Sequence, residues 1–260
     1  MNTEQPETET VVPDQDTGTQ PLLSVQDLQT YFFTDEGTVK AVDGASFEVH
    51  AGKTLGIVGE SGCGKSITAR SILQIIDRPG QIVGGQVKFS PNGVDGLNLL
   101  DLEPNGKEIR SIRGGEISMI FQEPMTSFSP VHTFGNQIIE AIRLHSSLEK
   151  KEAYDLAVDW MRRVGIPSPE QRMSEYAYQF SGGQRQRAMI AMALCTDPSI
   201  LIADEPTTAL DVTTQAQILD ILQTLQKQND MSIIFITHDL GVIAEVADVV
   251  AVMYLGKVVE

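Results

Sequence analysis

The residues with the clearest chemistry form a short glycine-rich stretch, "GESGCGKS", from Gly59 to Ser66. It follows the apolar run 54–58 and precedes a helical pattern over 66–76. Glycines let a loop wrap closely around an anion so that its N–H groups surround a phosphate, and a lysine and a serine add a cation and a hydroxyl. Between a strand and a helix, this pattern indicates a nucleotide site with Lys65 on the β- and γ-phosphates and Ser66 on Mg²⁺. The predicted nucleotide-binding residues of the loop are Gly59, Glu60, Ser61, Gly62, Cys63, Gly64, Lys65, Ser66 and Ile67.

Two adjacent carboxylates end another apolar run, "SILIADEP". Asp204 and Glu205 lie at the carboxyl end of the strand expected over 199–204, and open α/β sheets bind ligands at that edge. Asp204 can then hold Mg²⁺, and Glu205 can polarise a water for attack on the γ-phosphate. A solvated acidic strand end is the plain alternative, but the apolar run before the pair and the glycine loop elsewhere favour catalysis.

Gln122 and His238 each follow a further apolar run, "ISMIF" and "SIIFI". Taken alone, the first is an ordinary amide at a strand end and the second an ordinary helix-capping or loop histidine. Parallel strands, however, bring their carboxyl ends to one edge of a sheet. Both side chains are therefore candidate contacts for the γ-phosphate and the attacking water.

A second helix start with anion-binding character occurs in "YQFSGGQRQR". Ser181 and the glycines 182–183 precede a buried-helix pattern over 182–196, and such a start presents free N–H groups and the positive end of a helix dipole. Because Lys65 and Ser66 already hold one nucleotide, this second start has no phosphate of its own within the chain.

The apolar runs predict an α/β fold. Runs 22–33 and 38–49 flank a turn at Gly37 and predict an antiparallel hairpin. The strands expected over 199–204 and 232–237 are apolar without alternation, which is typical of a parallel sheet covered on both faces. Further strands are expected over 54–59, 85–90, 116–121, 249–254 and 257–260, and helices over 66–76, 131–145, 148–166, 182–196, 212–228 and 239–247.

The composition of the chain argues against several classes of function. A formal net charge of -16 argues against an extended nucleic-acid surface, which needs clustered Lys and Arg. Cys63 and Cys195 match neither a disulfide framework nor a metal-ligand spacing, which favours a reducing cytoplasm. Residues 1–21 read as a disordered acidic tail. No signal peptide and no apolar run long enough to span a bilayer is seen, so a membrane role must come through a partner.

Six motifs, "GESGCGKS", "IFQEP", "FSGGQRQR", "ILIADEP", "TTALD" and "ITHD", occur in this order. The combination resembles the ATP-binding subunit of ABC transporters over about residues 22–260. Longer phrases such as "MIFQEPMTSFSP" and "DEPTTALDVTTQAQIL" are most similar to the oligopeptide, dipeptide and nickel importer branch. The resemblance implies a P-loop NTPase core with a mostly parallel sheet, an N-terminal antiparallel β subdomain, and an inserted α-helical subdomain at about 123–181.

The resemblance also implies roles for single residues. Phe32 or its neighbour Tyr31 would stack on adenine, the other being a hairpin aromatic. Gln122 would link the γ-phosphate and the metal to the helical subdomain, His238 would contact the γ-phosphate, and Glu205 would be the catalytic base. The implied Mg²⁺ ligands are Ser66, Gln122 and Asp204, the residues acting on the other subunit's ATP are Ser181, Gly182, Gly183 and Gln184, and the dimer-interface residue is Asp211.

The function implied is a motor that hydrolyses ATP and drives import of oligopeptides or dipeptides. Its partners would be a second ABC ATPase, identical or homologous, two transmembrane permease subunits and an extracytoplasmic substrate-binding protein, with the chain peripheral on the inner face of the membrane. Nickel or oligosaccharide import, an exporter motor, and a DNA-maintenance ATPase are the alternatives. Three features depart from the family pattern. Phe180 stands where the signature usually has leucine, the cysteine-bearing tail of many relatives is not seen after Glu260, and the stretch 90–115 is longer than a minimal core needs and has no assigned role.

Overall fold

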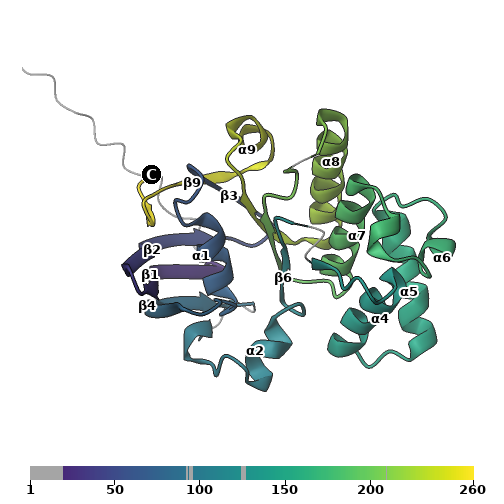
Figure 1. Ribbon diagram of the computed structural model, residues 1–260, viewed down its shortest axis with the longest axis horizontal. Coiled ribbons are helices and arrows are strands. Elements are labelled where there is room, and N and C mark those ends of the chain that lie inside the picture. Colours follow the sequence, from purple (N-terminus) through teal and green to yellow (C-terminus); the bar gives the residue numbers. More distant parts are fainter. Residues whose placement is uncertain (1–19, 92, 94–95, 124–126, 209) are drawn as a thin grey trace, which may run out of the picture.

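In the computed structural model, residues 20–91, 93, 96–123, 127–208 and 210–260 are described. The tail predicted over 1–21 therefore lies almost wholly outside the described residues. The elements in chain order form two sheets flanked by helices (Figure 1). Described strands are β1 Leu23–Thr34, β2 Gly37–Val49, β3 Thr54–Val58, β4 Gly80–Phe89, β5 Leu97–Asn98, β6 Ile117–Ile120, β7 Ile200–Asp204, β8 Ser232–Ile236, β9 Val249–Tyr254 and β10 Lys257–Val258.

A six-stranded sheet in the order β10-β9-β3-β8-β7-β6 forms the centre of the molecule. Its strands are parallel except for β10, which pairs antiparallel with β9. Every residue of β3, β7 and β8 is buried, because helices or the second sheet cover both faces. The carboxyl ends of β3, β6, β7 and β8 consequently open at one edge, where the motifs of the sequence converge.

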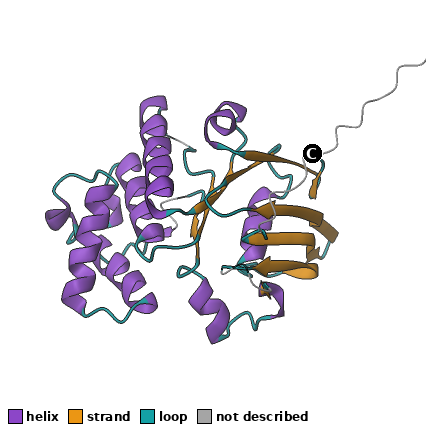
Figure 2. Cartoon of the chain, turned by 180° about the vertical axis from the view of Figure 1, so that it is seen from behind, coloured by secondary structure: helices purple, strands orange, loops and turns teal. Residues whose placement is uncertain are grey.

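The second sheet is antiparallel, in the order β2-β1-β4-β5, and begins with the predicted hairpin. It stacks beside helix α1 at one end of the molecule, whereas most helices gather at the other end (Figure 2). Described helices are α1 Lys65–Ile72, α2 Lys107–Ile112, α4 Phe134–His145, α5 Lys150–Arg163, α6 Pro169–Arg172, α7 Gly182–Leu194, α8 Val212–Asn229 and α9 Leu240–Val246, with 3₁₀ turns at Leu99–Asp101 and Ala177–Gln179.

Two hydrophobic cores lie on the two faces of the parallel sheet. Along β7, Ile200 and Ile202 pack toward α1 and the antiparallel sheet, whereas Leu201 and Ala203 pack toward α4, α5, α7 and α8. Successive side chains of a strand point to opposite faces, so an unbroken apolar run fills both cores. The mixed α/β fold class expected from the sequence is confirmed.

Helix α1 ends at Ile72, four residues earlier than the sequence pattern predicts. Gln74 adopts a φ of 51° and its side-chain amide donates to the carbonyl oxygens of Leu99 and Leu102. The guanidinium of Arg113 donates to the carbonyl oxygens of Leu73 and Gln74 at 2.6 and 2.9 Å. The two residues that follow the helix, Leu73 and Gln74, are thus held by hydrogen bonds with the 97–113 segment in a conformation that does not continue the helix.

Candidate nucleotide-binding site

The glycine-rich loop after β3 packs against the chain at two glycines. A Cβ on Gly59 would lie 2.3 Å from the carbonyl oxygen of Met253 in β9, and one on Gly64 would lie 2.2 Å from that of Ala41 in β2. Both glycines have positive φ values, 155° and 109°, that side chains disfavour. The loop is therefore fixed between the two sheets, with α1 starting directly after it.

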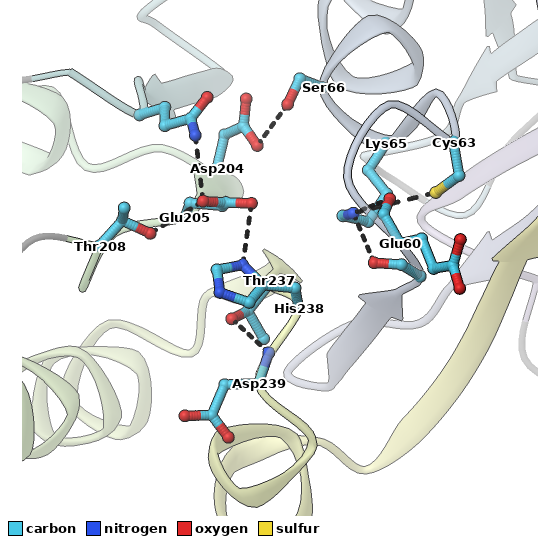
Figure 3. Close-up of polar contacts among 12 residues, drawn as sticks. Glu60, Cys63, Lys65, Ser66, Asp204, Glu205, Thr208, Thr237, His238 and Asp239 are labelled. Carbon is cyan, nitrogen blue, oxygen red and sulfur yellow. Dashed lines mark hydrogen bonds and ion pairs between the residues drawn. The ribbon is translucent and has the colours of Figure 1, made fainter.

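Lys65 turns its side chain back into this loop. Its Nζ donates to the carbonyl oxygens of Gly59 at 2.7 Å and Glu60 at 2.9 Å, and lies 3.8 Å from the thiol of Cys63 (Figure 3). Only 5% of Lys65 is exposed. The ammonium group thus lies at the centre of the loop, where a phosphate cradled by the loop would meet it. Of the other predicted loop residues, Ser61 and Gly62 are exposed and Ile67 is half-buried in the first turn of α1.

Ser66 and Asp204 meet across the sheet edge. The Ser66 hydroxyl donates to Asp204 Oδ1 at 2.9 Å, and Asp204 is 2% exposed. Burial raises the pKa of Asp204 above its ordinary value, and the neighbouring charge of Glu205 adds to this rise, against the hydrogen bond from Ser66. A buried carboxylate with a raised pKa is stabilised by a nearby cation.

This donor set fits magnesium. Mg²⁺ prefers oxygen ligands and usually takes one or two from protein beside water and phosphate oxygens. Ser66 and Asp204 offer a hydroxyl and a carboxylate side by side. Among the residues that the structure describes, no group of three or more His, Cys, Asp and Glu side chains that could hold a metal ion is found.

Glu205 is the meeting point of three segments. Its Oε2 accepts hydrogen bonds from Gln122 Nε2 at 3.0 Å and from Thr208 Oγ1 at 2.8 Å, and its Oε1 lies 3.3 Å from His238 Nδ1 (Figure 3). Glu205 itself has a φ of 47°. The structure therefore brings together Gln122, Glu205 and His238, which the sequence placed at the ends of three separate strands.

The two adjacent carboxylates differ in their electrostatics. Burial acts to raise the pKa of Glu205, but hydrogen bonds from Thr208 and His238 and the charge of Lys65 outweigh it, so that the pKa falls below its ordinary value. Asp204 shifts in the opposite direction. Neighbouring carboxylates whose pKa values are pushed apart are typical of sites where they have different tasks. Here, Glu205 is the one held ionised and in reach of other segments.

The second helix start, at α7, is closed by its own side chains. Ser181 Oγ accepts from the N–H of Gln184 at 3.3 Å, and Gln184 Oε1 accepts from the N–H of Ser181 at 3.0 Å, which forms a capping box. A Cβ on Gly183 would lie 2.8 Å from Thr214 of α8, whereas one on Gly182 would meet nothing within 4 Å. One side of this start thus packs on α8, and the other is open.

Asp211, the residue predicted at the dimer interface, begins α8. Its carboxylate accepts from the N–H of Thr214 at 3.0 Å and from the Thr214 hydroxyl at 2.7 Å. These hydrogen bonds lower the pKa of Asp211. Since Thr214 also faces Gly183, the start of α8 and the start of α7 lie against each other.

The two aromatic candidates for adenine differ in their contacts. The hydroxyl of Tyr31 donates to Asp43, and Lys40 Nζ lies 5.1 Å from the centroid of its ring. The ring of Phe32 instead closes over Gly80, where a Cβ would lie 2.7 Å from Phe32 Cε1. Both residues are half-buried in β1, and the choice between them stays a prediction.

Thr208 was not singled out by the sequence, although it donates the shorter hydrogen bond to Glu205. A hydroxyl three residues after a carboxylate in a non-helical segment was the available signal, since such residues commonly bond to a neighbour in a turn. In "DEPTTALD" two threonines compete for that position, and only the structure shows which of them faces the carboxylate.

A protein-family model described as ABC transporter matches residues 42–208. A dipeptide transport ATP-binding protein of Bacillus subtilis is 51% identical over 240 residues, covering 92% of this chain and 70% of the relative. A probable peptide ABC transporter ATP-binding protein of Sinorhizobium fredii gives the same identity and shares. An oligopeptide transport ATP-binding protein of Bacillus subtilis is also 51% identical, with 65% of its length covered. The chain belongs to the ABC transporter family, as one of its ATP-binding members.

Solved structures agree on the fold. A dimeric ATP-binding cassette in a post-hydrolysis state, bound to ADP and Pi, superposes with a TM-score of 0.79 over 92% of this chain and 97% of its own. The sequence identity is 23%, so this likeness shows the fold alone. Within the described part of the chain, no helix is long and apolar enough to cross a membrane.

Proposed function

We propose that this chain is the ATP-hydrolysing subunit of an importer for oligopeptides or dipeptides. The observation that carries the catalytic part is the position of Glu205, whose carboxylate contacts Gln122 and His238 at the sheet edge where Ser66 and Asp204 also meet. The relatives named as dipeptide, oligopeptide and peptide transport proteins support the substrate class.

In the proposed reaction, the glycine loop and Lys65 hold the β- and γ-phosphates, because the loop's N–H groups and the ammonium together supply a concentrated positive field. Phe32 or Tyr31 would stack on the adenine. Ser66, Asp204 and Gln122 would hold Mg²⁺, which when bound neutralises charge on the phosphate oxygens. Glu205 takes a proton from the attacking water, for which its lowered pKa keeps it ionised near neutral pH.

Gln122 and His238 would turn between the carboxylate and the γ-phosphate, because each already lies within 3.3 Å of a Glu205 oxygen. Ser181, Gly182, Gly183 and Gln184 would close over the γ-phosphate held by a second ABC ATPase, with Asp211 at the interface. Two permease subunits and an external binding protein would complete the transporter, with this chain peripheral on the inner face of the membrane.

The change Glu205→Gln tests the catalytic assignment. The amide keeps the shape and an acceptor oxygen but cannot take the proton, so we expect hydrolysis to fall by at least about 100-fold. Binding of a fluorescent ATP analogue should stay within about twofold, since none of the loop contacts changes. An undiminished steady-state rate in this variant would sink the assignment.

A further inference from the structure

The two oxygens of the Glu205 carboxylate have different surroundings. Oε2 accepts two hydrogen bonds, from Gln122 at 3.0 Å and from Thr208 at 2.8 Å. Oε1 has one longer contact, 3.3 Å to His238 Nδ1. One oxygen is therefore anchored by two donors, and the other faces a side chain that is 62% exposed.

Only one of these three partners belongs to the same turn as Glu205. Gln122 follows β6 and His238 follows β8, whereas the N–H of Thr208 also donates to the Glu205 carbonyl oxygen at 3.2 Å. The turn itself is tied to β8, because the N–H of Glu205 donates to the carbonyl oxygen of Ile236 at 2.9 Å. Thr208 can thus stay on the carboxylate while Gln122 and His238 move toward a nucleotide.

We propose that Thr208 is a positioning residue, whose hydroxyl anchors Oε2 of Glu205 so that Oε1 faces the attacking water. This rests on the function proposed above, in which Glu205 is the base. A hydrogen bond to an ionised acceptor is among the stronger ones in proteins, and a carboxylate held by it loses rotational freedom about its last bond.

The chemical step then has a defined geometry at the carboxylate. The water oxygen forms a bond to the γ-phosphorus, the bond from that phosphorus to the bridging oxygen breaks, and its electron pair leaves with ADP. The water proton goes to Oε1, while Oε2 keeps the hydrogen bond from Thr208. Positioning of the base lowers the barrier without changing how tightly ATP binds, so its loss acts on kcat.

Three variants of the full chain separate this role from a structural one. Thr208→Val removes the hydroxyl at nearly constant shape and should lower kcat for ATP hydrolysis about tenfold, with KM within about twofold. Thr208→Ser keeps the hydroxyl and should stay within about twofold of the unchanged chain in both constants. Thr224→Val, on the exposed face of α8, is the matched control and should change neither.

The outcomes are distinguishable from failure of the proposed function. If the unchanged chain hydrolyses ATP and Glu205→Gln does not, but Thr208→Val keeps full kcat, the role of Thr208 is wrong and the base stands. A rise in KM at constant kcat, or a serine variant as slow as the valine variant, would also overturn it. If Glu205→Gln is fully active, the proposed function itself fails.

Discussion

The two helix starts that attract anions, at α1 and at α7, are built differently. Helix α1 follows Gly64 and has no side-chain cap, while Lys65 folds back into the loop. Helix α7 follows Ser181, which forms a capping box with Gln184. The first start leaves its N–H groups to a ligand and supplies the ammonium of Lys65. The second start satisfies part of its own polar groups, and its nearest cation, Arg185, donates to the carbonyl oxygens of Ala177 and Phe180.

The packing around the two starts differs as well. In the loop before α1, Gly59 and Gly64 lie against carbonyl oxygens of β9 and β2, whereas Gly62 has open space. At α7, Gly183 is pressed against Thr214, but Gly182 has open space on its side. This difference supports the proposal that the loop before α1 binds the phosphates of this chain's own nucleotide, whereas the start of α7 acts on a nucleotide held by a second ATPase.

Alanine substitutions at the two glycines that begin α7 test this comparison through the stability of the chain. Gly183→Ala should be less stable than Gly182→Ala by about 1 kcal/mol, because both substitutions gain the helix propensity of alanine but only the Cβ at 183 would meet Thr214, at 2.8 Å. Gly182→Ala should not destabilise the chain, since the Cβ meets nothing and alanine favours a helix. Urea titration of both variants provides the measurement.

The substitution that leaves the stability unchanged, Gly182→Ala, should nevertheless lower the rate of ATP hydrolysis. If Gly182 faces a second ATPase, Gly182→Ala should still lower hydrolysis about tenfold, because small displacements at a closing site are costly. A Gly182→Ala chain with an unchanged rate would show that the open side of α7 takes no part in the site.

A smaller effect concerns the buried carboxylate of Asp204 and the free energy of unfolding. Because the pKa of Asp204 is raised in the folded chain, its charged form destabilises the folded state at about pH 7. This destabilisation vanishes at a pH low enough to protonate Asp204 in both the folded and the unfolded state. Asp204→Asn keeps an acceptor for Ser66 and should raise the free energy of unfolding in EDTA without nucleotide.

This gain should disappear as the pH falls below about 4, because the unfolded Asp then gains its proton too. Asp220→Asn, at an exposed position of α8, is the control and should have a smaller effect at every pH. An Asp204→Asn chain less stable than the unchanged one at about pH 7 would contradict the assignment of burial as the main cause.

The sequence predicted the parts of this site that are local. A strand, a glycine loop and a helix in succession require Lys65 near a phosphate, and apolar strands followed by Gln122, Glu205 and His238 require convergence at one sheet edge. What that reasoning could not supply is the contact of each side chain. The bond from Thr208 depends on the turn after β7, where Glu205 has a positive φ.

The end of α1 shows the same limit in the fold. The apolar spacing of Ile72 and Ile76 continues a helical pattern, yet the helix stops at Ile72. Directly after it, the carbonyl oxygens of Leu73 and Gln74 accept hydrogen bonds from Arg113, some forty residues later in the chain. The local helix propensity of a segment carries no information about a hydrogen-bond donor that reaches it only in the tertiary structure. Nor does the sequence pattern reveal α6 or the short elements of 97–113.

The central claim is that the loop before α1 binds this chain's own nucleotide, whereas the start of α7 acts on a nucleotide held by a second ATPase. Its most direct test compares Lys65→Ala with Gly182→Arg, measuring both the Kd for ATP and the hydrolysis rate. Lys65→Ala should raise Kd between about tenfold and a hundredfold, since it removes a charged donor from the loop that binds the phosphates. Gly182→Arg should leave Kd within about twofold but lower hydrolysis by at least about twentyfold. An equal rise of Kd in both variants, or an unchanged rate in Gly182→Arg, would contradict the account.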